Sequence, residues 1–327
     1  MSGVDTVEVQ ASEDGMRLDR WFKAHYPKLG HGALQRLLRT GQVRLDGSRA
    51  KANARIAEGQ MVRVPPMNDG PPAPKPDVPR EDAAMVRDLV VHRDKSVLAL
   101  NKPSGLAVQG GTKTERHIDG MLDALTFEAK ERPRLVHRLD RDTSGVLLLG
   151  RTRKATTALA KSFQSRRTQK TYWALVAGVP RPERGRISLP LVKAGRAGEQ
   201  RMVVAGAHED GAQNAETVYQ VVDRAGNRFS WLALSPLTGR THQLRVHMAE
   251  IGHPIVGDTK YGGEEADPGE GIEMRLHLHA RELLLDHPDG GELAVSAPLP
   301  AHMARSWSFL GFSENDPMSQ SLFDVMS

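Results

Sequence analysis

The stretch LVHRLDRDTSG, residues 135–145, places Asp140 between Arg138 and Arg141, immediately before four apolar residues. A charged loop that leads through two hydroxylated residues and a glycine into a buried strand is anchored, so its side chains can be held in one geometry. A nearby guanidinium would keep the Asp140 carboxylate ionised, as a nucleophile or a base must be. A salt-bridged surface turn would give the same pattern. We therefore regard Asp140 as a candidate catalytic residue and Asp142 as a structural one.

Tyr172 lies in the strand-like segment QKTYWALVAG, residues 169–178. The chain has only four tyrosines, and a tyrosine in such a segment is as often part of a core as part of a site. In a site, its ring can stack on a planar base while its hydroxyl takes part in proton transfer. Tyr172 is the second candidate.

The third candidate is Arg245, in PLTGRTHQLRVHMAEIGHPI, residues 236–255. This stretch predicts a helix from Thr241 to Gly252, stopped by the glycine and by a following proline. The predicted buried stripe consists of Leu244, Met248 and Ile251. Arg245 falls on a different face with His242 and Ala249. From there a guanidinium can form a bidentate pair with a carboxylate such as Asp140.

Metal and nucleotide sites have little support in the sequence. The histidines that could ligate a metal are His242, His247, His253 and the H-x-H pair His277 and His279. No carboxylate or cysteine stands at a supporting spacing, and many arginines lie nearby. The sequence contains neither a G-x-x-x-x-G-K-[ST] loop nor a G-x-G-x-x-G run. We expect no metal and no nucleotide cofactor.

The overall composition favours a soluble, cytoplasmic protein with a polyanionic partner. The 327 residues include 45 lysines and arginines against 40 acidic residues, a formal charge of +5. The absence of cysteine excludes disulfides and thiolate chemistry and is typical of a reducing compartment. The first residues lack the apolar segment of a signal peptide, and no apolar run is long enough to span a membrane.

The stretch PPMNDGPPAPKPDVPR, residues 65–80, has seven prolines among sixteen residues and predicts an extended linker. It separates a small unit from a large one. The predicted organisation is an N-terminal extension (1–15), a small basic unit (16–65), a linker (66–84), a large unit (85–311) and a tail (312–327).

The small unit is strongly basic. Residues 16–65 hold eleven lysines and arginines but three acidic residues, which predicts a phosphate-binding face. Apolar spacing predicts two helices, followed by a hairpin with its turn at Asp46-Gly47. We select as candidate RNA-binding residues Arg17, Arg36, Arg39 and Arg44.

The large unit alternates strand-like and helical segments without a strict βαβ repeat. The predicted helices cover 117–129, 155–165 and 241–252. This pattern favours an α+β fold with a mixed, largely antiparallel sheet flanked by helices.

Together, the motifs resemble those of a known enzyme family. HRLDRDTSG, KTYWALV and TGRTHQLRVHMAEIGHPI are similar to three motifs of the RluA-type pseudouridine synthases, and LALNKPSG matches a further segment. AVQGG and LPLVKAGRAGEQRMVV point to the group that acts on large-subunit ribosomal RNA. In the small unit, RLDRWF, LLRTGQVRLDG and EGQMVRV resemble the S4 RNA-binding domain.

The resemblance implies an isomerase that breaks the bond between uracil N1 and ribose C1′ and rejoins the base through C5. By this resemblance Asp140 is the catalytic aspartate, Tyr172 stacks on the uracil, and Arg245 pairs with Asp140. Arg138 helps to hold the RNA open, with His137 and Arg240 as further RNA contacts. The implied partner is large-subunit ribosomal RNA, bound by a monomer without a metal or other cofactor.

The role of the Asp140 carboxylate stays open among attack at C1′, addition to uracil C6 and removal of the 2′ proton. Two other functions are considered. A noncatalytic ribosome-assembly factor would use the same basic surfaces but leave the three candidate residues unexplained. An N-glycosidase would break the same bond but release free uracil.

Overall fold

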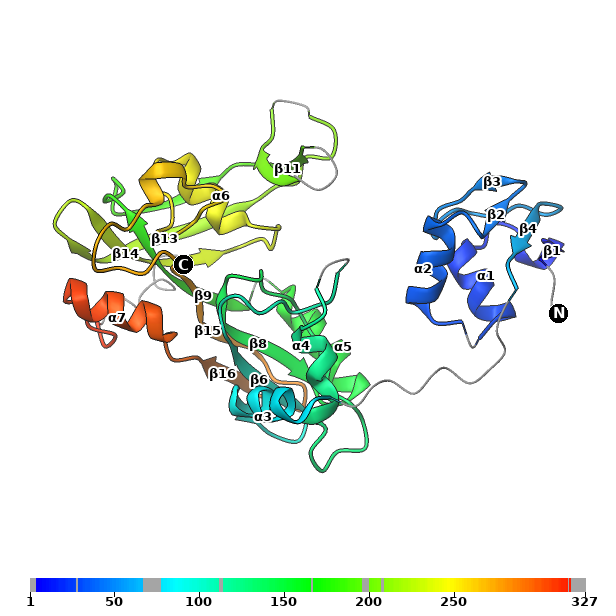
Figure 1. Cartoon of the computed structure of the whole chain (residues 1–327), viewed down its shortest axis with the longest axis horizontal. Helices are drawn as coiled ribbons and strands as arrows, with labels where there is room; N and C mark the ends of the chain where they lie inside the picture. The colour runs from blue at the N-terminus through cyan, green and yellow to red at the C-terminus, as the bar shows by residue number, and fades with distance from the viewer. Residues whose placement is uncertain are drawn as a thin grey trace. The chain divides into compact units, whose positions relative to one another are not determined.

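The computed structural model describes residues 4–27, 29–66, 78–111, 114–165, 167–195, 200–206, 209–316 and 318. The chain divides into two compact units, Met1–Pro76 and Asp77–Ser327. Figure 1 shows the helices and strands of each unit.

The smaller unit packs two helices against a four-stranded sheet of order β1-β4-β2-β3. Leu18, Trp21 and Phe22 of the first helix are at most 1% exposed and share a core with strand residues such as Val62. The predicted turn is present, because Asp46 and Gly47 both have positive φ between β2 and β3. The elements are β1 (Asp5–Glu8), η1 (Ala11–Glu13), α1 (Leu18–His25), α2 (His31–Arg39), β2 (Arg44–Leu45), β3 (Ser48–Arg49) and β4 (Met61–Val64).

Two boundaries of this region differ from the predicted ones. Residues 4–15 of the predicted N-terminal extension belong to the smaller unit, because β1 pairs antiparallel with β4 and Val9 is buried in the core. The predicted linker, 66–84, is shorter, because α3 (Arg80–Asp88) begins inside it after Pro79. Proline before a helix and acidic residues in its first turn are both start signals, which the proline count obscured. Residues 67–77 of that linker lie outside the described part of the chain.

The larger unit is built on a large mixed sheet with helices, as predicted. Its ten strands follow the order β10-β13-β14-β9-β15-β8-β6-β5, with β16 paired to β15 and β7 paired to β8. The strands are β5 (Val90–Arg93), β6 (Val97–Lys102), β7 (Arg134–Leu135), β8 (Ser144–Gly150), β9 (Gln169–Ala177), β10 (Arg184–Ser188), β13 (Glu216–Ala225), β14 (Phe229–Pro236), β15 (Leu278–Asp286) and β16 (Glu292–Ser296).

Strand β15, which comes late in the sequence, lies between β8 and β9 at the centre of this sheet. It pairs parallel with β8 and antiparallel with β9. The contact with β8 requires a glycine, because a Cβ on Gly145 would lie 2.2 Å from the carbonyl oxygen of Ala280. Gly145 also has a φ of +109°, which other residues rarely adopt. The segment before β8 is therefore fixed to the middle of the sheet.

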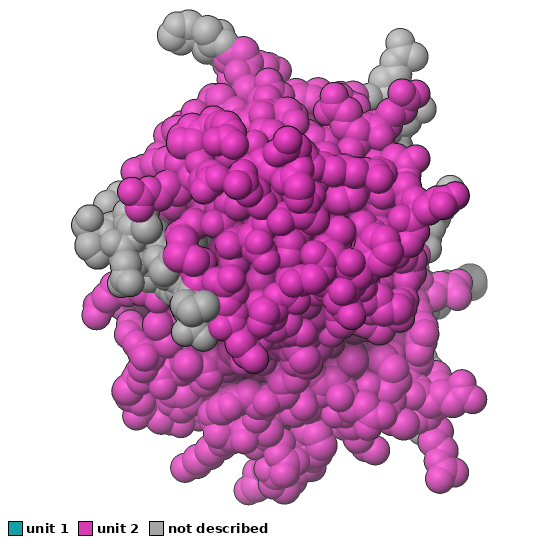
Figure 2. Space-filling model, turned by 90° about the vertical axis from the view of Figure 1, so that its left-hand side faces the viewer, with its two compact units in different colours: residues 1–76 teal, residues 77–327 magenta. Residues whose placement is uncertain are grey.

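Helices cover the sheet of the larger unit and bury its apolar side chains. Helix α7 packs Trp307 against Trp231 of β14, with ring centroids 5.6 Å apart. Figure 2 shows one face of this unit as a space-filling view, in which its atoms cover most of the face. The remaining helices are α4 (Ile118–Met121), η2 (Leu122–Leu125), α5 (Arg153–Phe163), α6 (Gln243–Glu250), η3 (Gly263–Ala266) and α7 (Ala301–Leu310).

Two further segments differ from the prediction, and one element lies where no secondary structure was predicted. The helix expected over 117–129 is shorter, since η2 ends at Leu125 and Phe127 has a φ of 48°. A separate hairpin of β11 (Leu191–Ala194) and β12 (Arg201–Val204) forms within the segment 189–204. The predicted tail, 312–327, begins with a buried residue, because Phe312 packs into the core beside α7. Residues 317 and 319–327 lie outside the described residues.

Candidate active site

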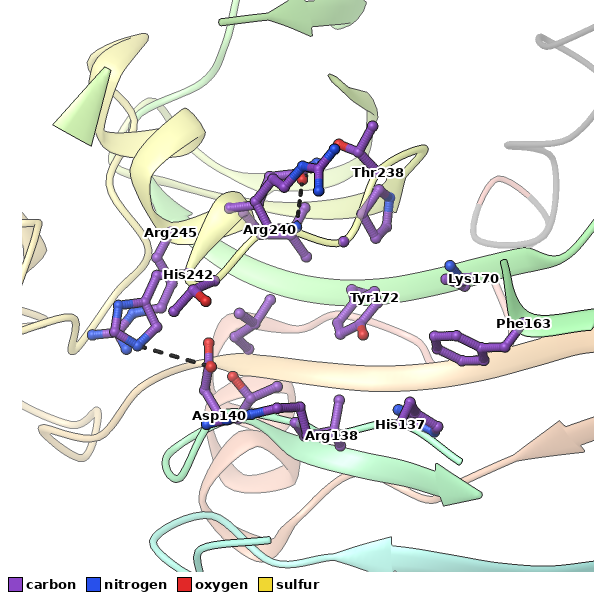
Figure 3. Close-up of a pocket in the computed structure, with 18 residues that line it drawn as sticks. His137, Arg138, Asp140, Phe163, Lys170, Tyr172, Thr238, Arg240, His242 and Arg245 are labelled. Atoms are coloured by element: carbon purple, nitrogen blue, oxygen red, sulfur yellow. Dashed lines mark hydrogen bonds and ion pairs between the residues drawn. The ribbon is translucent and has the colours of Figure 1, made fainter. Parts of the chain in front are cut away.

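The larger unit contains a pocket of about 290 Å³. Its lining brings together ionisable and aromatic residues of three segments that lie far apart in the sequence. The pocket is lined by residues 137–140 and Thr143 before β8, Phe163, Lys170 and Tyr172 of β9, Pro236, residues 238–245 and Leu278. In Figure 3, Arg138 and Asp140 come from the loop before β8, Lys170 and Tyr172 from β9, Phe163 from the end of α5, and His242 from the start of α6. Asp140, Tyr172 and Arg245 thus share one pocket, together with His137, Arg138 and Arg240.

The loop that carries Asp140 is held by a buried lysine. Lys102 is fully buried, and its Nζ donates hydrogen bonds to the carbonyl oxygens of Pro103, Leu106 and Arg141 at 2.8 to 2.9 Å. Three carbonyl acceptors match the three donors of an ammonium group. Burial nevertheless lowers the pKa of Lys102 to about 7, although Asp142 and Asp140 act in the opposite direction. The NKPSG segment is therefore what fixes the backbone next to Asp140.

Tyr172, on β9, is only partly buried, and it lines the pocket rather than lying entirely within the core. Burial raises the pKa of its phenol well above the ordinary value, and the charge of Asp140 acts in the same direction. The hydroxyl therefore stays protonated at neutral pH and can donate a hydrogen bond. Its ring presents a flat apolar surface to the pocket, as stacking on a base requires.

The predicted pair between Arg245 and Asp140 is wrong. Arg245 donates from Nε and Nη2 to the two carboxylate oxygens of Asp258, at 2.8 and 2.7 Å. Asp258 is 1% exposed and also accepts hydrogen bonds from the backbone N–H groups of Lys260 and Tyr261. Burial acts to lower the pKa of Arg245, but Asp258 outweighs it and the pKa is raised. The more buried carboxylate, that of Asp258, therefore accepts both hydrogen bonds from Arg245. Asp140 interacts with Arg245 only through its charge, at longer range.

The predicted helix is wrong in its bounds and in the face that holds Arg245, although Leu244 and Met248 of the predicted stripe are buried. Helix α6 covers Gln243–Glu250 rather than 241–252, and six consecutive residues from Gln243 to Met248 are buried. A helix that is buried all round places Arg245 inside the protein rather than on an exposed face. The buried arginine is tolerated because Asp258 satisfies it.

His242, which sequence reasoning treated only as a metal candidate, is the ionisable side chain that lies beside Asp140. Its Nε2 is 3.8 Å from Asp140 Oδ1, as the dashed line in Figure 3 marks. It stands at the start of α6 in a left-handed conformation, with a φ of 53°. Such conformations in non-glycine residues are concentrated at functional sites. The one signal in the sequence was that His242 falls on the predicted helix face of Arg245, the face expected to point toward the site.

The three predicted RNA contacts in the pocket differ in character. Arg138 is exposed, and its guanidinium has no hydrogen bond or ion pair to another described residue. Arg240 is exposed as well, and its Nε donates to the carbonyl oxygen of Asn214 at 3.0 Å. His137 is not a cation, because burial lowers its pKa to about 3. Its Nε2 accepts a hydrogen bond from the backbone N–H of Leu148, so it supports the loop rather than a phosphate.

The histidines considered as metal ligands are engaged in hydrogen bonds. His277 contacts the Arg275 carbonyl and Ser306 Oγ, and His279 contacts Ser144 Oγ and the Ala297 carbonyl. His247 contacts Thr217 Oγ1 and the Leu189 carbonyl, and His253 contacts the Ala177 carbonyl. Among the described residues, no group of three or more potential ligands is placed to hold a metal ion.

In the smaller unit, two of the four arginines selected as RNA-binding candidates already form hydrogen bonds within the unit. Arg17 donates to both carboxylate oxygens of Asp19, at 3.1 and 2.6 Å. Arg44 donates to the carbonyl oxygens of Gly41 and Gly47. Arg36 and Arg39 are exposed on α2. A shallow groove beside Arg17 is lined by Arg17, Asp19, Arg20, Lys23 and His31.

Comparison with known proteins agrees with the resemblance seen in the motifs. A family model described as RNA pseudouridylate synthase matches residues 96–250. The chain is 36% identical to ribosomal large subunit pseudouridine synthase C of Yersinia pestis, over 90% of this chain and 92% of that protein. It is 33% identical to RNA pseudouridine synthase 4, mitochondrial, of Arabidopsis thaliana, over 95% of this chain and 82% of that protein.

Solved structures give a similar result. The chain resembles human RNA pseudouridylate synthase domain containing 4, with a TM-score of 0.59 and 31% identity, over 71% of this chain and 97% of that chain. Human RNA pseudouridylate synthase domain containing 1 gives a TM-score of 0.54 and 30% identity, over 64% of this chain and 83% of that chain. No helix in the described part of the chain is long and apolar enough to cross a membrane.

Proposed function

Because the chain belongs to the RluA-type RNA pseudouridine synthase family, we propose that it isomerises uridine to pseudouridine in large-subunit ribosomal RNA. The observation that carries this proposal is that Asp140 and Tyr172 line one pocket although 31 residues separate them in sequence. Relatives named for the large ribosomal subunit support the substrate. The protein is thus an isomerase, and its reaction neither adds nor removes atoms.

Asp140 is the proposed catalytic carboxylate. Its side chain is 23% exposed, so the carboxylate can reach a substrate in the pocket while its loop stays anchored. A uridine stacked within RNA cannot be reached, so the target must first leave its stack, at a cost of a few kcal/mol. Exposed Arg138 and Arg240 at the pocket can offset that cost by contacts with phosphates.

Tyr172 is proposed to stack on the extruded uracil. Its protonated hydroxyl can donate to an oxygen of the base, and its ring supplies the apolar surface. Stacking on an aromatic ring is worth about 1 to 3 kcal/mol per base. Arg245 acts through Asp258 and through its charge near Asp140, and it need not touch the substrate.

The smaller unit is proposed to be an S4-like RNA-binding domain. The support is its two helices with a short hairpin, its surplus of basic residues, and the exposure of Arg36 and Arg39 on α2. Arg44 and Arg17 are committed to partners within the unit, so α2 carries the freer part of the basic surface. We also propose that the enzyme acts as a cytoplasmic monomer without a cofactor.

The test is to map pseudouridine in ribosomal RNA from cells that lack the protein and are then supplied with variants. Asp140→Asn should bind RNA normally and form no product. Asp142→Asn is the matched control, because Asp142 is exposed and does not line the pocket. Product from Asp140→Asn, or identical maps with and without the wild-type protein, would refute the proposal.

A further inference from the structure

His242 is the group beside Asp140 that the predicted mechanism does not use. Its Nε2 lies 3.8 Å from Asp140 Oδ1. That separation is longer than a hydrogen bond, but catalytic contacts often tighten only when substrate is bound. Since Arg245 is committed to Asp258, His242 is the residue placed to orient the carboxylate from this side.

The other ring nitrogen of His242 is held by a tyrosine. His242 Nδ1 and Tyr261 Oη are 2.6 Å apart, and Tyr261 Oη accepts a hydrogen bond from the backbone N–H of Met202 at 3.2 Å. The phenol has one proton to give. When that proton is donated to Nδ1, the neutral ring carries its own proton on Nε2, which faces Asp140. The opposite tautomer would direct a lone pair at the carboxylate.

We propose that His242 is a positioning residue for Asp140, and that Tyr261 selects the tautomer in which Nε2–H donates to the carboxylate. This inference rests on the proposed function, because it assigns a partner to the proposed catalytic group. One carboxylate oxygen is then anchored, and the other is directed into the pocket. The left-handed backbone of His242, with a φ of 53°, is the local strain that brings the ring to this point.

The charges around His242 favour a neutral donor over an ion pair. Burial lowers its pKa, Asp140 and Asp258 oppose this, and Arg245 and Lys260 reinforce it. The net direction is downward, so the ring is neutral near pH 7. A neutral donor orients Asp140 without cancelling the negative charge that a nucleophile or base needs.

A purely structural role is the alternative. Tyr261 also contacts the hairpin through Met202, and Lys260 Nζ donates to the carbonyl oxygen of Gln200. If His242 only supported this region, its loss would lower stability and RNA affinity. A positioning role affects kcat and its dependence on pH instead.

The experiment compares His242→Ala, His242→Gln, Tyr261→Phe and the double variant His242→Ala/Tyr261→Phe. Ala and Gln carry the same backbone strain, but only Gln keeps an N–H donor at the place of Nε2. The assay is pseudouridine formation at saturating enzyme, across pH, on ribosomal RNA from cells lacking the protein. His92→Gln is the matched control, because His92 forms a half-buried pair with Asp94 at 2.7 Å and does not line the pocket.

We expect His242→Ala and Tyr261→Phe to lower kcat by up to about hundredfold, with RNA affinity unchanged. The double variant should be no slower than His242→Ala, because both changes remove one interaction. His242→Gln should recover part of the activity. Its acid limb should lie at lower pH, because the glutamine cannot take up the proton that turns the neutral His242 ring into a cation beside Asp140. His92→Gln should behave as the wild type.

Equal losses in His242→Ala and His242→Gln, with an unchanged acid limb and a lower melting temperature, would overturn the inference. So would wild-type rates in Tyr261→Phe, a variant that keeps its ring against Arg245. These failures differ from a failure of the proposed function, in which Asp140→Asn itself would still form pseudouridine.

Discussion

Replacing Asp258 by asparagine should destabilise the larger unit far more than the same change at Asp140. Arg245 is 6% exposed and Asp258 is 1% exposed, and two hydrogen bonds join them. An asparagine side chain has one oxygen acceptor instead of two and carries no charge. The buried guanidinium of Arg245 is then left without its counter-ion. Breaking a buried ion pair in this way costs about 3 to 5 kcal/mol.

That cost can be translated into a melting temperature. For a unit of this size, about 1 kcal/mol corresponds to about 2 to 4 °C, so Asp258→Asn should lower Tm by about 6 to 20 °C. Asp140 is partly exposed and has no hydrogen bond to Arg245. Asp140→Asn should therefore change stability by no more than about 0.5 kcal/mol.

The assay is thermal unfolding of the two variants and the wild type, measured by calorimetry at neutral pH. The comparison is matched, because the same group is changed in the same way at two carboxylates near one arginine. If Asp140→Asn lowered Tm as much as Asp258→Asn, then Arg245 would be paired with Asp140 rather than with Asp258 alone.

Three further predictions address the fold and the smaller unit. Burial lowers the pKa of His279 to about 4. Below about pH 6.5 the unfolded chain therefore binds a proton at this histidine that the folded chain does not, and the free energy of unfolding should fall as the pH drops to about 4. Urea unfolding across this range should show a smaller fall in the free energy of unfolding for His279→Gln than for the wild type. Gly145→Ala would place a Cβ 2.2 Å from the Ala280 carbonyl oxygen and should lower Tm strongly, whereas Gly290→Ala has a similar φ but open space and should cost only the backbone strain; equal Tm values would contradict the close approach. Removal of residues 1–76 should leave the larger unit folded by circular dichroism but reduce the salt dependence of RNA binding, and an unchanged salt slope would show that this unit does not contact phosphates.

The residues that line the site were easier to predict from the sequence than the hydrogen bonds and ion pairs between them. Asp140 and Tyr172 could be selected because each follows a local pattern, a charged loop before a buried strand or an aromatic within one. The partner of Arg245 could not, because Asp258 lies beyond the helix in a turn whose burial depends on tertiary packing. His242 was misjudged for a related reason, since its left-handed backbone is set by the loop rather than by helix periodicity.

The fold shows the same limit. Alternating strands and helices predicted a mixed sheet, and the sheet is present. The placement of β15 between β8 and β9 was not predictable, because periodicity gives a strand's faces but not its neighbours. The early start of α3 could have been predicted from Pro79 and the acidic residues after it. The prediction of a linker gave more weight to the proline-rich composition of the segment.

The central position of β15 has a consequence for how the protein is made. The proposed catalytic aspartate, the tyrosine proposed to stack on the base and the buried arginine have all been synthesised by residue 245, yet the strand that lies between β8 and β9 begins at Leu278. A nascent or truncated chain that ends between these points carries every reactive group but cannot close its sheet. Domains fold as units during synthesis. Competence for modification should therefore appear abruptly, late in translation, once Leu278–Asp286 has left the ribosome.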